Sequence, residues 1–268
     1  MSISPLPKVL FFDVFGTVVE WRSCVTRALM RAAERALLDS EKQLSVDVRV
    51  RAGAMTLEDW QAIAKEWRAS YGRFTASFEP SSAFVSVDEH HYTYIQTLLQ
   101  QRGLDGMLTD EERWDLALCW HRLEPWSDTV EGLKLLNHQF RTCTLSNGNV
   151  ALLEDLQNYG SLPFTDVASA EHFGAYKPSS QVYHGAAKRF GLEPSECGMV
   201  AAHLYDLKAA KALGFMTIYI ERPQEENLSA ERIAEARQEG FVDQWVGLGC
   251  GGLVEVAKRF GIPAETNS

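Results

Sequence analysis

The sequence predicts an α/β protein built on a doubly wound parallel sheet, with an all-helical domain inserted near its beginning. The apolar run of residues 9–12 lacks the alternation of a strand with one exposed face, which is typical of buried parallel strands. After residue 123, short strands alternate with helices of about ten residues. Residues 21–122 hold helical patterns and no convincing strand. We therefore expect a discontinuous core of residues 1–20 and 123–268, and a helical cap of residues 21–122.

The cap is expected to be a set of helices joined by polar segments. Residues 39–50 are polar, mix acids with bases, and are expected to form a loop or short connection. Thr56 stands before two acidic residues, as an N-cap does, and marks a helix start. Residues 79–82 contain a proline and two serines and break the pattern. The expected cap helices cover about residues 18–38, 56–71 and 88–101, and a fourth, opened by Thr109 and the acids after it, covers 114–123.

The remaining core segments alternate between strand and helix patterns. The β-branched run 141–145, for example, ends at a Ser-Asn-Gly sequence, as a strand does before a loop. The expected strands after the cap are residues 141–145, 166–169, 199–202, 216–220 and 245–246. The expected helices are about residues 129–138, 150–159, 180–190, 204–213 and 253–260.

The composition is that of a soluble globular protein, with 46% hydrophobic and 23% charged residues among 268. The net charge of −10 argues against nucleic acid or an anionic membrane as a partner, because their phosphates need a basic surface. A small anionic substrate is compatible with it, since a pocket can be locally positive. No apolar run has the length of a membrane span, and residues 1–7 lack a signal-peptide pattern.

The cysteines show no Cys-x-x-Cys pair and are odd in number, so they are read as reduced thiols and not as a disulfide framework or zinc site. This usage predicts a cytoplasmic protein. The five positions are Cys24, Cys119, Cys143, Cys197 and Cys250.

Polar residues that suit chemistry follow four of the predicted core segments. The carboxyl ends of parallel strands meet at one edge of a sheet, where ligands bind, so these residues are expected to converge. Taken alone, the carboxylate after the first strand could equally be a cap of a strand-to-helix turn. The groups are Asp13 with Thr17, Ser146 with Asn147, Lys177, and His203 with Asp206.

In this order, a carboxylate, a hydroxyl, a lysine and a second carboxylate resemble the four motifs of the haloacid dehalogenase superfamily. The resemblance covers essentially the whole chain and implies a Rossmann-like core with an inserted cap. It makes Asp13 the nucleophile, with Ser146, Lys177 and Asp206 as the other motif residues.

The residue two positions after Asp13 distinguishes the branches of this superfamily. Its phosphatases carry a second Asp there, as the acid and base for the leaving alcohol. This chain has Phe15, which cannot transfer a proton. Asp206 is the only acid in the fourth motif, whereas Mg²⁺ and similar ions prefer several anionic oxygens. We therefore expect no metal or other cofactor, and a leaving group such as halide that needs no proton.

Further motifs resemble the L-2-haloacid dehalogenases of type II. The resemblance implies that Asp13 attacks Cα of a small-molecule 2-haloacid and expels halide, and that water then hydrolyses the aspartyl ester. It also implies a homodimer. The matching residues are Leu145-Ser146-Asn147-Gly148, Tyr176-Lys177-Pro178, Val182-Tyr183 and Trp67-Arg68.

The resemblance assigns roles that elementary chemistry supports. The ammonium of Lys177 would keep Asp13 ionised, although a lone lysine usually pairs with a surface acid. Thr17 would donate a hydrogen bond to the nucleophile. The other candidates are placed around the substrate, where turn formation or simple core packing is the alternative for each. These substrate-binding candidates are Phe15, Trp67, Arg68, Ser146, Asn147 and Tyr183.

The fourth motif departs from the type II pattern Ser-Ser-Asn-x-x-Asp. Ala201 replaces the first Ser, and His203 replaces the Asn thought to position water. His203 is either a satisfied core histidine or a group that orients or deprotonates the hydrolytic water. The second reading is favoured here.

Two other functions remain as alternatives. One is a magnesium-dependent phosphatase that acts on a small phosphate ester, for which Phe15 is the contrary residue. The other is a superfamily member that binds small acids or a partner without turnover, against which the four intact motif residues weigh. The sequence leaves open the preferred halogen, chain length and enantiomer.

Overall fold

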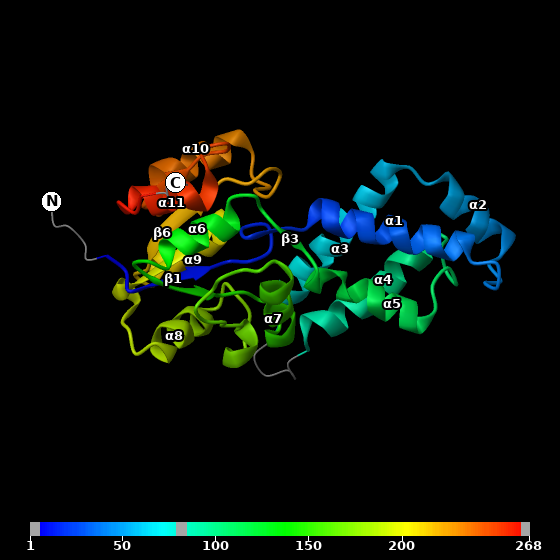
Figure 1. Ribbon diagram of the computed structural model, residues 1–268, viewed down its shortest axis with the longest axis horizontal. Coiled ribbons are helices and arrows are strands. Elements are labelled where there is room, and N and C mark those ends of the chain that lie inside the picture. Colours follow the sequence, from blue (N-terminus) through cyan, green and yellow to red (C-terminus); the bar gives the residue numbers. More distant parts are fainter. Residues whose placement is uncertain (1–5, 79–84, 264–268) are drawn as a thin grey trace, which may run out of the picture. The chain divides into compact units, whose positions relative to one another are not determined.

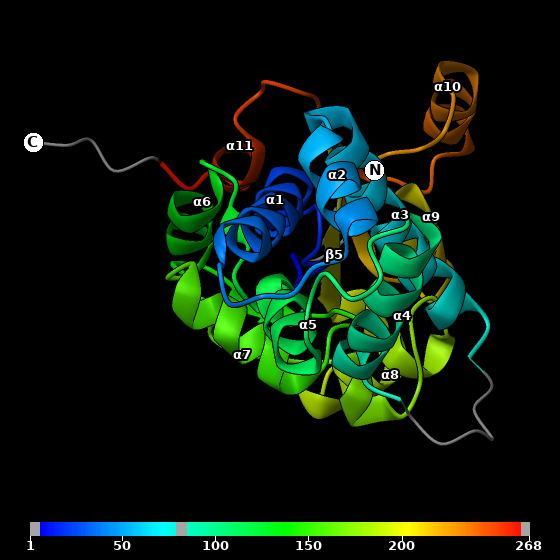
Figure 2. The ribbon, with the colours of Figure 1, turned by 90° about the vertical axis from the view of Figure 1, so that its right-hand side faces the viewer.

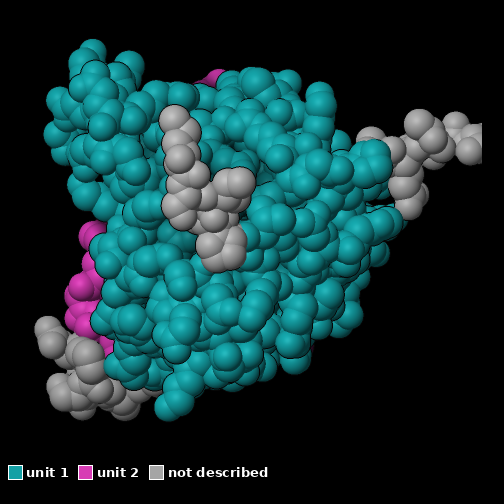
Figure 3. Space-filling view, turned by 90° about the vertical axis from the view of Figure 1, so that its left-hand side faces the viewer, with its two compact units in different colours: residues 1–20, 125–268 teal, residues 21–124 magenta. Residues whose placement is uncertain are grey.

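The computed structural model describes residues 6–78 and 85–263. Within them the chain forms two compact units, coloured separately in Figure 3. Unit 1 comprises residues 1–20 and 125–268, and unit 2 comprises residues 21–124. The short strands β2 (Val19–Glu20) and β3 (Glu124–Pro125) stand where the chain leaves and re-enters unit 1.

Unit 1 contains a five-stranded sheet in the order β4-β1-β5-β6-β7, and every neighbouring pair is parallel. The central strands are fully buried, which explains why their sequences are apolar without alternation. This arrangement confirms the predicted doubly wound parallel sheet. The strands are β1 (Val9–Phe12), β4 (Arg141–Thr144), β5 (Cys197–Ala201), β6 (Met216–Ile220) and β7 (Gln244–Val246).

The register of the sheet brings three strand ends together. Phe12, the last residue of β1, is opposite Thr144 of β4 on one side and Val200 of β5 on the other. The loops that follow these three strands therefore start at one edge of the sheet. Three of the sequence motifs, those after β1, β4 and β5, consequently begin side by side.

Helices cover both faces of the sheet. In Figure 1, α6 and α11 lie together on one side and α7 and α8 on the other, and α11 packs against α6. The helices of unit 1 are α6 (Thr129–Leu136), α7 (Val150–Tyr159), α8 (Ser180–Arg189), α9 (Leu204–Ala212), α10 (Ala230–Glu239) and α11 (Gly252–Arg259). Short 3₁₀ turns cover Ala170–Phe173 and Pro194–Glu196.

The described part of unit 2 consists mainly of helices, among which α3 packs against both α1 and α4 (Figure 2). Trp67 and Trp120 fill its core in an edge-to-face pair with ring centroids 5.7 Å apart. Its helices are α1 (Arg22–Leu38), α2 (Val46–Ala54), α3 (Leu57–Ala76), α4 (Val87–Gln101) and α5 (Asp110–Ala117), followed by a 3₁₀ turn (Leu118–His121).

Three predictions about secondary structure were wrong, and one helix was missed. The helix expected from residue 18 begins only at Arg22, because Val19 and Glu20 form β2. Residues 39–50 are not simply a loop, because α2 begins at Val46, where the Ser45 side chain accepts a hydrogen bond from the backbone N–H of Val48. Residues 166–169 form only isolated bridges to residues 143 and 146. Helix α10 was not expected. The predicted break at 79–82 lies outside the described residues.

No helix of the described chain combines the length and the apolar character that crossing a bilayer requires.

Candidate active site

Asp13 follows directly after β1, and both oxygens of its carboxylate accept hydrogen bonds. Its backbone N–H donates to the carbonyl of Val200, which continues the pairing of β1 with β5. Its Oδ1 accepts from the Lys177 ammonium at 2.9 Å, and its Oδ2 accepts from the Thr17 hydroxyl at 2.8 Å. Gly16, at φ +81°, supplies the turn that returns the chain toward the carboxylate.

Thr17 connects the first motif to the fourth. While its hydroxyl donates to Asp13, the same oxygen accepts from the backbone N–H of Ala202 at 2.9 Å. The side chain is completely buried. Thr17 therefore fixes the carboxylate of Asp13 relative to the loop after β5.

Lys177 occupies the centre of the cluster. Its ammonium donates to Asp13 and, at 2.5 Å, to Oδ2 of Asp206. The backbone of Lys177 is held by the Asn147 side chain, whose Oδ1 accepts from the Lys177 N–H at 2.7 Å and whose Nδ2 donates to its carbonyl at 3.2 Å. The second and third motifs are thus joined by an amide clamp.

Asp206 completes the cluster from the first turn of α9. Its Oδ1 accepts from the Tyr183 hydroxyl at 2.6 Å, and both side chains are fully buried. Both oxygens of this carboxylate are therefore occupied by donors. The structure brings together Asp13, Thr17, Lys177, Tyr183, His203 and Asp206.

Burial and charge oppose one another in this cluster. Burial alone would raise the pKa of Asp13, but the charge of Lys177 and the hydrogen bond and charge of His203 together hold that pKa well below its usual range. Burial would lower the pKa of Lys177, yet the charges of Asp13 and Asp206 raise it above its ordinary value. Asp13 is thus an ionised carboxylate beside a fixed ammonium.

The pKa values of the two remaining acids of the cluster, Asp206 and Tyr183, are raised, in contrast to that of Asp13. Burial, with the nearby charge of Asp13, raises the pKa of Asp206 despite the opposing effect of Lys177. Burial and the charge of Asp206 raise the pKa of the Tyr183 phenol, which therefore stays a hydrogen-bond donor. Asp13, of the two carboxylates, is the one that the protein favours as an anion.

His203 lies between two carboxylates. Its Nδ1 is 3.1 Å from Oδ2 of Asp13, and its Nε2 is 3.6 Å from Oε2 of Glu225. Its side chain is 11% exposed, so the ring reaches the edge of the cluster. His203 therefore contacts the predicted nucleophile directly.

Ser146 and Phe15 lie around the second motif. The Ser146 hydroxyl accepts from the backbone N–H of Gly148 at 3.2 Å, which is the turn geometry considered as the alternative for this residue. The Phe15 ring packs so close to Gly148 that a Cβ there would lie 3.1 Å from it. Their roles toward a substrate, like that of Asn147, stay predictions.

The two substrate-binding candidates of unit 2 have different environments. Trp67 is fully buried and its indole N–H donates to the carbonyl of His91. The guanidinium of Arg68 lies 4.6 Å over the ring of Tyr71 and 6.0 Å from that of Trp21. Tyr71 in turn stacks on His91. A part for either residue in substrate binding stays a prediction.

Sequence reasoning missed two buried residues of the loop after β6. Glu225 is 3% exposed and meets His203 as described. Arg222 donates through Nε to the carbonyl of Thr17 at 3.0 Å and pairs through both terminal nitrogens with Asp128. Neither residue belongs to a motif, and the only signal was their place after a strand of the parallel sheet.

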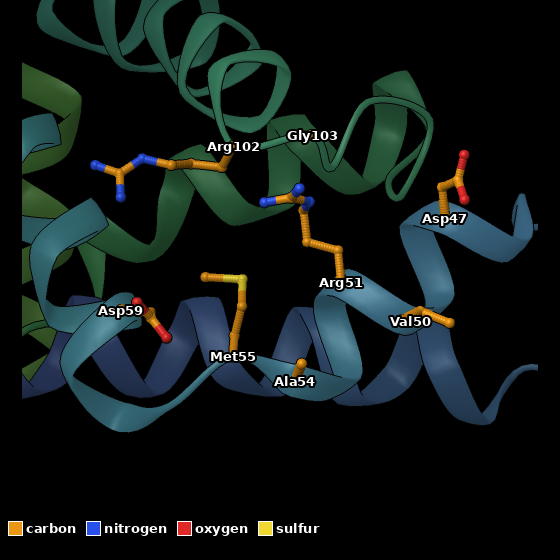
Figure 4. Close-up of a pocket in the computed structure, with 8 residues that line it drawn as sticks. All are labelled: Asp47, Val50, Arg51, Ala54, Met55, Asp59, Arg102 and Gly103. Carbon is orange, nitrogen blue, oxygen red and sulfur yellow. The ribbon is translucent and has the colours of Figure 1, made fainter.

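Within residues 6–78 and 85–263, no three His, Cys, Asp or Glu side chains are grouped so that they could hold a metal ion. A separate pocket of about 740 Å³ lies in unit 2, between α2 and the ends of α3 and α4 (Figure 4). It carries charges of both signs and contains none of the predicted site residues. Its lining is Asp47, Val50, Arg51, Ala54, Met55, Asp59, Arg102 and Gly103.

Comparisons with known proteins agree with the motifs. The (S)-2-haloacid dehalogenase 1 of Pseudomonas sp. (strain CBS-3) is 32% identical over 141 residues, which is 50% of this chain and 59% of that protein. The crystal structure of the defluorinating L-2-haloacid dehalogenase Rha0230 is similar, with a TM-score of 0.78, 30% identity and 94% of each chain covered. The L-2-haloacid dehalogenase PA0810 gives 0.75 and 30%, over 96% of this chain and 100% of that one.

The curated relative is thus matched over about three fifths of its own length. The family model described as haloacid dehalogenase-like hydrolase matches residues 7–214, which include the cluster around Asp13. This confirms the predicted family. The chain belongs to the haloacid dehalogenase-like hydrolases.

Proposed function

We propose that this protein is a hydrolase of carbon–halide bonds that converts short 2-haloalkanoic acids to 2-hydroxy acids. The observation that carries the proposal is the environment of Asp13, an ionised carboxylate fixed by Lys177 and Thr17 with Phe15 two residues later. The names of the three similar proteins described above, each a 2-haloacid dehalogenase, support it.

The first step proposed is a displacement at carbon. A carboxylate oxygen of Asp13 attacks Cα of the 2-haloacid opposite the halogen, and the halide leaves with the electron pair of the carbon–halogen bond. The product is an ester between Asp13 and the acid. The low pKa of Asp13 supports this step, because only the ionised form is a nucleophile. Phe15 fits it as well, since no proton is needed by a leaving halide.

The second step proposed is hydrolysis of that ester. Water attacks Cγ of Asp13, the bond from Cγ to the ester oxygen breaks, and the 2-hydroxy acid leaves with that oxygen. The oxygen of the water stays in the carboxylate of Asp13. His203 would orient the water or take its proton, because its Nδ1 already lies beside the Asp13 carboxylate.

The substrate carboxylate needs donors, and the proposal assigns Ser146 and Asn147 to it. Arg68 is proposed as the anchor for halide or carboxylate, because a guanidinium is always charged. The apolar wall is assigned to Phe15 and Trp67. Tyr183 is assigned a supporting place through its bond to Asp206.

The proposal extends to the state of the protein in the cell. We propose a cytoplasmic homodimer that works on a small-molecule haloacid and water, with no nucleic acid or membrane as partner. Size-exclusion chromatography with light scattering tests the dimer, and the mass of a monomer would contradict it.

The test is halide release from 2-chloropropionate in EDTA, with phosphate release from small esters in Mg²⁺ as the comparison. Halide release with EDTA present is expected. Asp13→Asn is expected to lower the rate by at least about 10³-fold, as loss of a nucleophile does. Asp166→Asn, which removes the charge of a half-buried partner of Arg141, is the control. Magnesium-dependent phosphate release without halide release would replace the proposal by the phosphatase.

Turnover in ¹⁸O-water tests the ester itself. In a single turnover with excess enzyme, the label is expected in Asp13 and the 2-hydroxy acid is expected to be unlabelled. Label in the product of that turnover would mean that water attacks Cα directly, which would overturn the covalent route while leaving dehalogenation in place.

A further inference from the structure

Glu225 is a buried carboxylate that takes no part in the two steps proposed above. It follows β6 and is only 3% exposed. Its side chain lies over Gly16, where a Cβ atom would come within 2.1 Å of Oε2. The missing side chain at position 16 is therefore what makes space for this carboxylate next to the first motif.

The loop that carries Glu225 is anchored to the same motif. The backbone N–H of Glu225 donates to the carbonyl of Arg222, and Arg222 donates to the carbonyl of Thr17. Arg222 is itself fixed by a bidentate ion pair with Asp128, with N–O distances of 2.5 and 2.8 Å. Glu225 thus has a defined position relative to Asp13, although the two are far apart in sequence.

Glu225 and Asp13 face opposite nitrogens of His203. Oε2 of Glu225 is 3.6 Å from Nε2, and Oδ2 of Asp13 is 3.1 Å from Nδ1. A neutral imidazole has one donor and one acceptor, so only the imidazolium can present an N–H to each carboxylate. The ring of Tyr205 also lies beside that of His203, with ring centroids 5.7 Å apart.

We propose that Glu225 is a positioning residue for ester hydrolysis and that it acts through His203. This inference rests on the proposed function. Its basis is that a carboxylate lies beside each imidazole nitrogen: when Asp13 becomes an ester it loses its charge, whereas the Glu225 carboxylate stays beside Nε2. A base oriented by a third group is a recurring arrangement in covalent catalysis.

His203 and the attacking water carry the protons of the ester hydrolysis. After halide leaves, the Nδ1 proton of the imidazolium passes to solvent, which leaves a neutral ring with its remaining proton on Nε2, facing Glu225. The attacking water gives a proton to Nδ1 while its oxygen bonds to Cγ of Asp13. Cγ then releases the ester oxygen, which takes the second water proton and leaves as the hydroxyl of the product. Asp13 and the imidazolium are restored, and one proton and one halide have been released.

The test separates the two chemical steps. Enzyme is mixed rapidly with 2-chloropropionate, the early halide release is followed, and the quenched protein is weighed by mass spectrometry for one added 1-carboxyethyl group. Glu225→Gln is expected to keep a first release of one halide per site, to slow steady turnover by about 10–100-fold, and to accumulate the ester. Glu221→Gln, a carboxylate of the same loop that accepts from Leu248 N–H, is the control.

A double-mutant cycle tests whether the effect passes through His203. In a His203→Gln background, Glu225→Gln is expected to cost less than twofold further. If Glu225→Gln does not fold, Glu225→Asp retains the buried charge and is expected to slow the same step at least about threefold, with partial activity.

The outcomes are distinguishable. A wild-type protein that releases no halide would overturn the proposed function itself. Normal halide turnover in Glu225→Gln, an equal loss in both steps, or full additivity with His203→Gln would overturn the role of Glu225 alone.

Discussion

The ammonium of Lys177 lies 2.9 Å from Oδ1 of Asp13, with 2% and 9% of the two side chains exposed. Because Lys177 also contacts Asp206, one buried cation serves two buried carboxylates. Removing one partner of a buried ion pair leaves a charge without compensation, which is more costly than loss of a surface pair. Loss of Lys177 is therefore expected to change both the stability of the fold and the charge state of Asp13.

The first prediction concerns Lys177→Met. We expect the free energy of unfolding at pH 7 to fall by about 3–5 kcal/mol, measured by urea denaturation. We also expect the pKa of Asp13 to rise, because the main charge that lowers it is gone, so that any remaining halide release shifts to higher pH.

Lys208→Met provides the matched control for that change. Lys208 pairs with Glu239 at 2.6 Å, but its side chain is 62% exposed. Loss of such a surface pair is expected to cost about 0.2–1 kcal/mol. Equal losses in the two variants would contradict the central place assigned to Lys177.

The cluster around Asp13 was predictable in part because all strands of a parallel sheet have their carboxyl ends at the same edge. Asp13 and Asp206 are distant in sequence, but Asp13 directly follows β1 and Asp206 lies in the first turn of the helix that follows the neighbouring strand β5. Glu225 was not predictable in the same way. Its place depends on the path of a loop and on the space above Gly16, which no spacing in the sequence reveals.

The errors in secondary structure have equally specific causes. Val46 and Val50 of α2 are 76% and 65% exposed, so apolar residues on the solvent side obscure the short buried stripe of Val48 and Ala52. At residues 166–169 the Thr144 hydroxyl donates to the Ala168 carbonyl and accepts from its N–H. A side chain thus takes the bonds that a continuous strand would have given to backbone.

The second prediction concerns Tyr71. Arg68 lies 4.6 Å over its ring, the ring stacks on His91 with centroids 5.9 Å apart, and His91 stacks on Trp120 at 4.4 Å. A cation over an aromatic face is stabilised by about 0.5–2 kcal/mol. If Arg68 anchors the substrate, Tyr71→Leu is expected to raise KM for 2-chloropropionate about 3–10-fold with a smaller change in kcat.

Tyr71→Phe is the control, since it keeps the ring beneath the guanidinium. Its KM is expected to stay within about twofold of the wild-type value. A similar rise in KM for both variants would show that the hydroxyl, and not the ring face, supports Arg68.

The third prediction uses the pH dependence of stability. Burial, with a smaller effect of Arg73, lowers the pKa of His90 to about 4 in the fold, against 6.5 in the unfolded chain. Between these values the unfolded chain takes up a proton that the folded protein does not, so stability falls as pH drops from 6.5 to 4 and is unaffected above 6.5.

His90→Gln should remove this effect, because the amide does not titrate and can still bond to the Ser70 hydroxyl, now 3.0 Å from Nε2. Between pH 7.5 and pH 5 the variant is expected to lose roughly 1 kcal/mol less unfolding free energy than wild type, allowing for the partly exposed ring. Urea denaturation at both pH values measures it, with His184→Gln on the exposed face of α8 as control. Parallel losses in His90→Gln and wild type would contradict the shift.

The last prediction concerns Gly16→Ala. A non-glycine residue at φ +81° is strained by about 1–2 kcal/mol, and the added Cβ would also displace the Glu225 carboxylate. Gly191→Ala is matched for strain, since Gly191 has φ +66° and nothing lies within 4 Å of its Cβ position. Both variants are expected to lose about 1–2 kcal/mol of unfolding free energy from strain, with a further loss in Gly16→Ala alone. Only Gly16→Ala is expected to slow ester hydrolysis, because only there does Glu225 move away from His203. If the two variants hydrolyse the ester equally fast, the carboxylate over Gly16 does not govern the second step.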